Sequence, residues 1–216
     1  MFAALLFVLA YGGGLWLVFG VENEARRRLI SRLLPPLSLL ALLVLSSFFS
    51  PFQRLLLATV ILLGLLKCAV ALRRPKADIR AFSRLGLALY FSIWPGVDLT
   101  PFKTRGGWNF SAAERRNDAR ALFRGATFFV LGMAAFVALC WNAPHLSRDF
   151  LGWATIATLL AMVHLGIGEM MPWFFHQIGF RVGPLFRAPL MSADLSDFWS
   201  RRWNLPFVEM DKILFL

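Results

Sequence analysis

The sequence has 216 residues, of which 58% are hydrophobic, and its formal net charge is +11 at pH 7. Its mean hydropathy is +0.64, and soluble globular proteins have an apolar share of only about 45–50%. A soluble domain of this size would be unable to bury so much apolar surface. A nucleic-acid-binding protein can be equally basic, but its basic residues gather on a water-facing patch. Here Lys and Arg lie in clusters between apolar runs, which is typical of a membrane protein with basic cytoplasmic loops. We expect membrane lipids as partners and no nucleic acid.

The cysteines and histidines do not form a recognisable metal-binding pattern. Cys68 and Cys140 both fall within apolar runs, where cysteine usually acts as a small hydrophobic residue. Neither a CxxC pair nor a zinc-type His/Cys spacing is present. The sequence therefore predicts no disulfide framework, no metal site and no bound cofactor.

The first third of the chain contains three apolar runs. Residues 1–21 carry no charge and are long enough to cross a hydrocarbon core of about 30 Å. They lack the basic start and small-residue cleavage site of a secretory signal, so we expect a retained span. A basic loop over residues 22–32 precedes a second span at 33–53, and a third follows at 55–72. The third contains Lys67, whose ammonium group we expect to snorkel toward the interface near Arg73.

The middle of the chain is basic and holds one short apolar run. The loop over residues 73–84 carries five Lys and Arg residues, and residues 85–97 are apolar but only 13 long. That length favours a re-entrant or interfacial segment over a full span. The pattern Ser111-Ala-Ala-Glu114 resembles a capping box that opens a helix. Further spans are expected at 121–141 and 150–168, with Glu169 closing the second, and residues 172–189 are expected to be interfacial.

Charge gives the expected topology. The loops at 22–32, 73–84, 103–124 and 181–202 hold 19 of the 23 Lys and Arg residues, so they are predicted to face the cytoplasm. The fold class is then all-α: about five transmembrane helices, an outside N-terminus, a re-entrant segment and a C-terminal amphipathic helix on the cytoplasmic side. One integral membrane domain, residues 1–216, comprises three N-terminal spans (1–72), a basic loop with the re-entrant segment (73–120), two spans (121–168) and an interfacial segment (169–216). A bacterial inner membrane is the expected location.

Charged and aromatic side chains gather between Asp194 and Asn204. This stretch includes two acids, two arginines and two tryptophans. Helical spacing predicts that Trp199 and Trp203 stack on one side and that Asp197 pairs with Arg201 at i, i+4. Arg201 and Arg202 would hold an anionic group, such as a phosphate of coenzyme A or of a lipid. A plain amphipathic interfacial helix, with Trp in the headgroups and Arg on lipid phosphates, explains the same pattern.

The stretch Ser-Ala-Asp-Leu-Ser-Asp-Phe-Trp-Ser-Arg-Arg-Trp-Asn-Leu-Pro-Phe, residues 192–207, resembles the signature of wax synthase-like proteins in the membrane-bound O-acyltransferase superfamily. Residues 179–190 are similar to the approach to that signature. Trp94-Pro-Gly-Val-Asp98 with Pro101-Phe102 resembles a second, looser landmark.

The resemblance implies transfer of a fatty acyl group from acyl-CoA, as co-substrate, to a long-chain alcohol, which gives a wax ester or related lipid ester. It implies that Asn204 lies near the reaction tunnel. We expect Asn204, Arg201 and Arg202 to line the acyl-donor side and Trp199 and Trp203 to shape the tunnel mouth, with Asp197 as a further substrate-binding residue. Members of the family take their general base from a histidine on a later helix. The sequence ends at Leu216, so it is expected to match the N-terminal portion of the family.

Without that later histidine, the intramembrane His164 is the candidate catalytic base, although a neutral histidine bonded within its helix is the commoner case. Two other functions remain open. One is a truncated, non-catalytic membrane protein that binds lipid or acyl-CoA or needs a partner chain. The other is a transporter, which the few polar residues in the spans disfavour.

Overall fold

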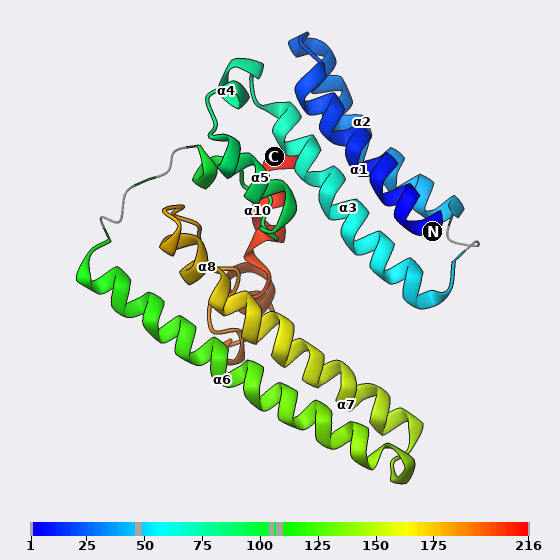
Figure 1. The fold of residues 1–216 in the computed structure, drawn as a ribbon, viewed down its shortest axis with the longest axis vertical. Coiled ribbons are helices and arrows are strands. Elements are labelled where there is room, and N and C mark those ends of the chain that lie inside the picture. The colour runs from blue at the N-terminus through cyan, green and yellow to red at the C-terminus, as the bar shows by residue number, and fades with distance from the viewer. Residues whose placement is uncertain (1, 46–48, 104–105, 107–109, 216) are drawn as a thin grey trace. The chain divides into compact units, whose positions relative to one another are not determined.

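The computed structural model describes residues 2–45, 49–103, 106 and 110–215. Every helix or strand element assigned to these residues is helical, as the composition predicts (Figure 1). They form two compact units, residues 1–104 with 206–216 and residues 105–205, and each is described separately. The expectation of one integral domain over residues 1–216 stays a prediction.

The first unit is built on one long helix, α3 (Pro51–Arg73), which packs against both α1 (Phe2–Gly20) and α2 (Glu24–Leu45). Its remaining elements are α4 (Lys76–Arg80), α5 (Arg84–Ser92), the 3₁₀ turn η2 (Thr100–Phe102) and α10 (Leu205–Phe215), which begins at the last residue of the second unit. The core contains Leu66, Ala69, Val70 and Val97, with Met210 of α10 packed against them.

The basic stretch at residues 22–32, expected to be a loop, is helical from Glu24 onward. The reason is Arg27, whose side chain is fully buried. Its guanidinium donates to the carbonyl oxygens of Val18 and Val21 at the end of α1, and of Ala71 and Arg74 at the end of α3. Carbonyls at the ends of helices have spare acceptor capacity, so both terminal nitrogens of the guanidinium are hydrogen-bonded inside the protein and a buried arginine fits in the first turn of α2.

The expectation that Lys67 snorkels is also wrong. Its side chain is only 3% exposed, and its ammonium donates to the carbonyl oxygens of Tyr90, at 2.7 Å, and Trp94. These carbonyls lie at the end of α5, where the helix dipole favours a cation. Sequence spacing does not indicate this contact, because Tyr90 lies 23 residues after Lys67 in the chain.

The short apolar segment at residues 85–97 contains α5, a helix of nine residues. At about 1.5 Å per residue it is too short to cross a hydrocarbon core of about 30 Å. The hydroxyl of Tyr90 donates to the carbonyl oxygen of Val97 at 2.7 Å and holds the following turn against the helix. The re-entrant placement in a membrane stays a prediction.

The second unit is organised around a long helical hairpin. Its first arm is α6 (Ala112–Asn142) and its second arm runs without a break through α7 (Arg148–Leu160), the π-helical segment η4 (Ala161–Ile167) and α8 (Gly168–Gln177). The turn η3 (Ala143–His145) joins the arms, and η5 (Pro189–Met191), α9 (Leu195–Asp197) and the π-helical segment η6 (Phe198–Arg202) follow. The predicted capping box is confirmed: the Ser111 hydroxyl accepts from the Glu114 amide at 3.2 Å, and the Glu114 carboxylate accepts from the Ser111 amide at 2.7 Å.

The second arm does not end at Glu169, as the sequence predicted, but continues through Pro172 to Gln177. Glu169 is buried and forms an ion pair with Arg124 of α6. Because this pairing holds α8 against α6, the helix continues despite the hydrogen bond that proline removes. The predicted interfacial segment at 172–189 is therefore helical in its first third.

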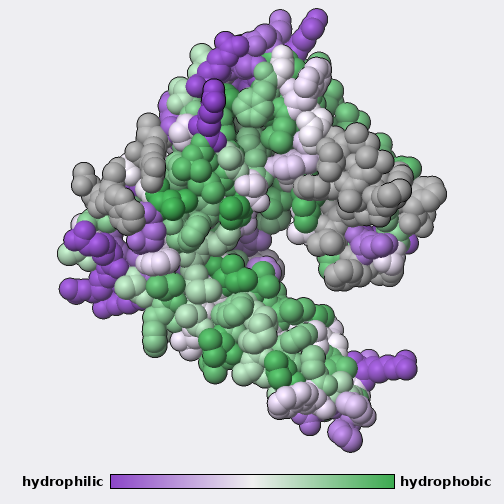
Figure 2. Space-filling model, in the orientation of Figure 1, coloured by the Kyte–Doolittle hydropathy of each residue, from purple (hydrophilic) through white to green (hydrophobic). Residues whose placement is uncertain are grey.

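Three described helices are long and apolar enough to cross a membrane: Gln53–Arg73, Ala112–His145 and Arg148–Gln177. In the second unit the most apolar windows of the two arms are only 11% and 17% buried, and hydrophobic side chains predominate on the face of the hairpin that Figure 2 shows. Lipid is the solvent that suits such a surface. The described residues are consistent with a helical membrane protein that has three candidate spans.

Candidate functional site

The candidate site is built on the hairpin of the second unit, where small residues bring its arms together. A Cβ on Gly125 would lie 2.8 Å from the carbonyl oxygen of Gly166, and a Cβ on Gly132 would lie 2.6 Å from Met162 Cγ. Small residues permit this close approach of helices. The contact holds η4 directly against α6 and fixes the position of His164, which lies in η4.

His164 is part of a cluster of four rings. Its imidazole stacks on the Trp203 indole, with ring centroids 5.4 Å apart and planes at 12°. Phe186 meets the imidazole edge-on at 5.7 Å and lies 5.1 Å from Trp203. Phe198 stacks on Trp203 at 5.2 Å and 15°. The structure therefore joins the predicted base to the predicted motif, 39 residues apart in sequence.

The motif itself is wound as a π-helix, which changes the predicted pairings. Arg202 Nε donates to Asp197 Oδ2 at 2.5 Å, so Asp197 pairs at i, i+5 and not with Arg201 at i, i+4. The Trp203 amide donates to the Phe198 carbonyl at 2.8 Å, again five residues back. The wider turn of a π-helix brings residues five apart onto one face, which a spacing of 3.6 residues does not predict.

The predicted stack of Trp199 on Trp203 is also wrong. The π-helical segment ends at Arg202, and Trp203 is extended, with φ −94° and ψ 133°. Trp203 turns inward to His164, while Trp199 is 61% exposed and meets only Phe198 edge-on among the described aromatic pairs. Trp199 therefore remains available at the surface of this unit.

Two backbone hydrogen bonds hold the end of the motif against the segment before it. The Arg187 amide donates to the Arg202 carbonyl at 2.8 Å, and the Leu205 amide donates to the Leu185 carbonyl at 3.0 Å. Between them lies Asn204, at a left-handed φ of 46°. Asparagine tolerates this conformation better than most residues, which fits its place immediately after Trp203. The two stretches that carry the family resemblance, 179–190 and 192–207, are thus bonded to each other.

The charges around the motif are partly neutralised within it. The hydrogen bond from Arg202 holds the pKa of the Asp197 carboxyl below its usual range, with help from the Ala193 amide. Asp197 is therefore ionised at neutral pH and orients Arg202. Arg201 is exposed, so it is the cation of the pair that is more accessible to a ligand.

The three histidines have different surroundings, which sequence could not rank. His176 uses both ring nitrogens, at 2.9 Å from Asp118 Oδ2 and 2.9 Å from the Val182 carbonyl. His145 is exposed in η3. His164 has a buried Nδ1 without a hydrogen-bond partner among the described residues. Because both ring nitrogens of His176 are engaged and His145 is exposed in a turn, His164 is the histidine that we assign as the candidate base.

Sequence reasoning missed several contributors to this site. Phe186 lies in the stretch already singled out, but nothing indicated its contact with His164. The Arg124–Glu169 ion pair joins residues 45 positions apart, which no local spacing indicates. The described residues include no group of three or more His, Cys, Asp or Glu side chains able to hold a metal ion.

No family model matches the chain, and no curated protein or solved structure is found to be similar to it.

Proposed function

We propose that this chain is a membrane acyltransferase that moves a fatty acyl group from acyl-CoA to an alcohol, giving a wax ester or related lipid ester. The observation that carries the proposal is the stacking of His164 on Trp203 of the motif. The Nδ1 atom of His164 is buried and has no hydrogen-bond partner within the described part of the chain. The resemblance of residues 192–207 to wax synthase-like proteins supplies the reaction class.

The proposed reaction begins when the imidazole of His164 takes the proton of the alcohol. General bases of this kind accelerate such reactions by about 10²–10⁴-fold. The alkoxide oxygen attacks the thioester carbonyl carbon, the new C–O bond forms and the C–S bond breaks. The departing CoA thiolate takes the proton back from the imidazolium, so the neutral base is restored and free CoA is released.

The other motif residues are assigned to binding. Asn204 follows Trp203 directly, and its amide would donate a hydrogen bond to the developing oxyanion. Arg201 and Arg202 would hold phosphates of the acyl donor, with Asp197 orienting Arg202. Trp203 forms the inner wall beside His164, and the exposed Trp199 forms the entrance.

The same proposal includes five spans, with residues 1–21 and 33–53 added to the three candidate spans. The basic loops face the cytoplasm of a bacterial inner membrane, and the motif lies on that side. Support comes from the charge distribution, since 19 of the 23 Lys and Arg residues lie in the four predicted inside loops.

The test is transfer of labelled palmitoyl from palmitoyl-CoA to a long-chain alcohol by the purified chain in lipid. His164→Ala is expected to reduce the rate at least 100-fold, a loss of about 10²–10⁴ being usual for a general base. Asn204→Ala is also expected to slow transfer. His145→Ala is the matched control and should leave the rate unchanged, because His145 is exposed in a turn.

Equal rates for His164→Ala and the parent chain would refute this assignment of the base. Tight binding of acyl-CoA with no ester formed would favour the alternative, a non-catalytic acyl-CoA-binding protein or one that needs a partner chain. Addition of the partner would then restore transfer only in the second case.

A further inference from the structure

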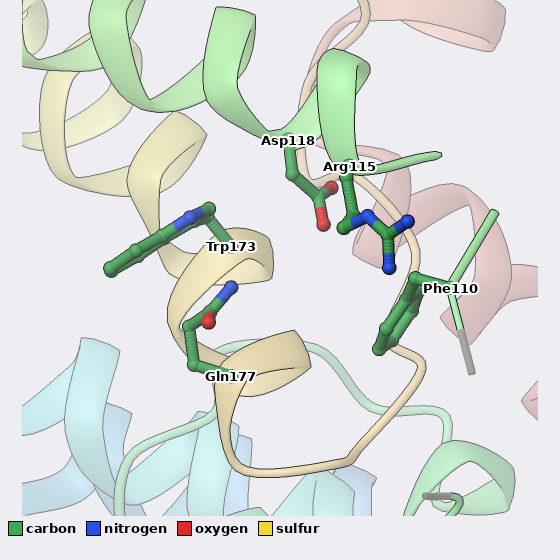
Figure 3. Close-up of a pocket in the computed structure, with 5 residues that line it drawn as sticks. All are labelled: Phe110, Arg115, Asp118, Trp173 and Gln177. Atoms are coloured by element: carbon green, nitrogen blue, oxygen red, sulfur yellow. The ribbon is translucent and has the colours of Figure 1, made fainter. Parts of the chain in front are cut away.

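The second unit contains a cavity of about 310 Å³. None of the residues that line it belongs to the ring cluster around His164. Its lining comes from the first turns of α6, the end of α8 and the residue that lies two positions before α6: Arg115, Asp118, Trp173, Gln177 and Phe110. Figure 3 shows these side chains arranged around a common space. The volume is at the lower end of the range for ligand pockets, about 300–1,000 Å³.

The pair formed by His176 and Asp118, beside the cavity, carries no net charge. His176 Nε2 meets the Val182 carbonyl, which can only accept, so this nitrogen carries a hydrogen. His176 Nδ1 meets Asp118 Oδ2 at 2.9 Å, and one hydrogen must lie between these atoms. Whether the histidine or the aspartic acid holds that proton, the pair is neutral in total.

A second charged pair is also balanced. Arg181 Nη1 lies 3.6 Å from a Glu114 carboxylate oxygen, and its guanidinium lies 4.8 Å above the Phe110 ring. Phe110 also contacts the His176 imidazole, at 5.0 Å between centroids. The Phe110 ring is therefore already in contact with the Arg181 guanidinium and the His176 imidazole. These contacts make it unsuitable for stacking on a nucleobase of a ligand.

Arg115 is the remaining charge. Its side chain has no hydrogen bond or ion pair with the part of the chain that the structure describes. The start of α6 adds the partial positive charge of a helix N-terminus. The cavity therefore has a net positive charge and suits a ligand with a single negative charge.

The place of the cavity on the helices indicates a lipid. The apolar run of α6 begins at Ala121, six residues after Arg115, so the Cα atom of Arg115 lies about 9 Å before the start of this run along the helix axis. This is the level of phospholipid headgroups, where Trp residues such as Trp173 are enriched. The large apolar side chains of Phe123 and Phe174 are exposed on the same two helices and offer a surface for acyl chains.

We propose that this cavity binds the headgroup of an anionic phospholipid, with its phosphate on the Arg115 guanidinium and the Gln177 amide. The Trp173 indole borders the glycerol, and the acyl chains lie against α6 and α8. The site is independent of transferase activity, and it would hold a structural lipid whether or not the chain is an enzyme.

The test measures binding of dioleoyl phosphatidylglycerol to the purified full chain in mild detergent, by native mass spectrometry across a lipid titration. Arg115→Gln is expected to weaken binding about tenfold, as loss of a charge-assisted hydrogen bond does. Arg116→Gln is the matched control: it removes the same charge one residue away, from a side chain that does not line the cavity. It should change binding less than twofold.

Four results would overturn the proposal. Equal losses in Arg115→Gln and Arg116→Gln would show a diffuse charge effect. Equal affinity for phosphatidylcholine would show that a net negative headgroup is not required. Competition by millimolar inorganic phosphate would point to a site for free phosphate and not for lipid. Arg115→Lys keeps the charge and should bind better than Arg115→Gln, and equal binding by these two variants would also contradict the charge argument.

Discussion

Arg27 connects the ends of two helices in the first unit. Its guanidinium donates to carbonyls at the ends of α1 and α3, and Glu24 lies 3.9 Å from its Nε. A guanidinium has five N–H donors in a planar fork, so one side chain can bond to several carbonyls at once. The negative ends of both helix dipoles favour the cation there.

Arg27→Met is expected to lower the free energy of unfolding by about 3 kcal/mol or more, because it leaves buried carbonyls without donors. The measurement is denaturant unfolding in mild detergent. Arg26→Met is the control, since Arg26 is exposed, and should change stability by about 0.5 kcal/mol or less. Similar effects of the two substitutions would contradict the role given to Arg27.

Asp78 gives the first unit a dependence on pH. The hydrogen bond from Lys103 lowers the pKa of the Asp78 carboxyl, and Arg74 contributes at 3.4 Å. A lowered folded-state pKa means that the ionised carboxylate stabilises the fold above the unfolded value of about 3.9. That stabilisation is lost as pH falls through the folded-state value.

Asp78→Asn should therefore reduce stability at pH 7 by up to about 1 kcal/mol, as partly exposed ion pairs allow. The difference from the parent chain should shrink as pH falls below about 4 and should vanish only below the lowered pKa of folded Asp78. Melting temperatures of both proteins between pH 7 and pH 3 provide the check. Asp149→Asn, at an exposed site without an ion pair among the described residues, should show a smaller difference at pH 7.

At the level of elements, the two parts of the candidate site are both π-helical. His164 lies in η4, and the motif lies in η6. A π-helical turn within a long helix often marks a functional site, and η4 is such a turn, between α7 and α8. Here one such turn presents His164 to Trp203, and the other pairs Asp197 with Arg202.

The close packing of η4 on α6 predicts that a side chain at Gly125 is destabilising. Gly125→Ala would place a methyl group 2.8 Å from the Gly166 carbonyl oxygen, and backbone cannot move aside as a flexible side chain can. We expect a loss of about 1–3 kcal/mol in stability, and slower acyl transfer because His164 shifts with η4. Unfolding and rate are measured on the same preparation.

Gly152→Ala is the matched control in the opposite arm. A Cβ at Gly152 meets no atom within 4 Å, so alanine should be neutral or should stabilise the helix by up to about 1 kcal/mol. A Gly125→Ala protein as stable as the Gly152→Ala protein would show that the close approach of the arms is not required.

For the whole molecule, the proposed topology places the two ends of α6 on opposite sides of the membrane. Single cysteines at Ser147→Cys and Asn117→Cys, in a Cys68→Ala, Cys140→Ala background, test this in intact cells with an impermeant maleimide. Position 147 should react from outside, and position 117 only after the cells are opened, because basic loops stay in the cytoplasm. The reverse pattern would overturn the orientation.

The sequence by itself determined the helical class, the apolar runs and the start of α6. These features depend on composition and on residues within four positions of one another, such as Ser111 and Glu114. It also indicated that His164 and the motif near Trp203 were the places to examine, because polar groups are costly within apolar runs.

Only the tertiary structure decided which partners these residues have. Lys67 and Arg27 donate to carbonyl oxygens at helix ends that are distant in sequence. His164 stacks on Trp203, which lies 39 residues later in the chain. The π-helical winding likewise moved the partner of Asp197 by one residue, to Arg202. Local sequence patterns indicate which polar groups need a partner. The identity of that partner depends on how distant helices pack against one another, which the spacing of neighbouring residues does not determine.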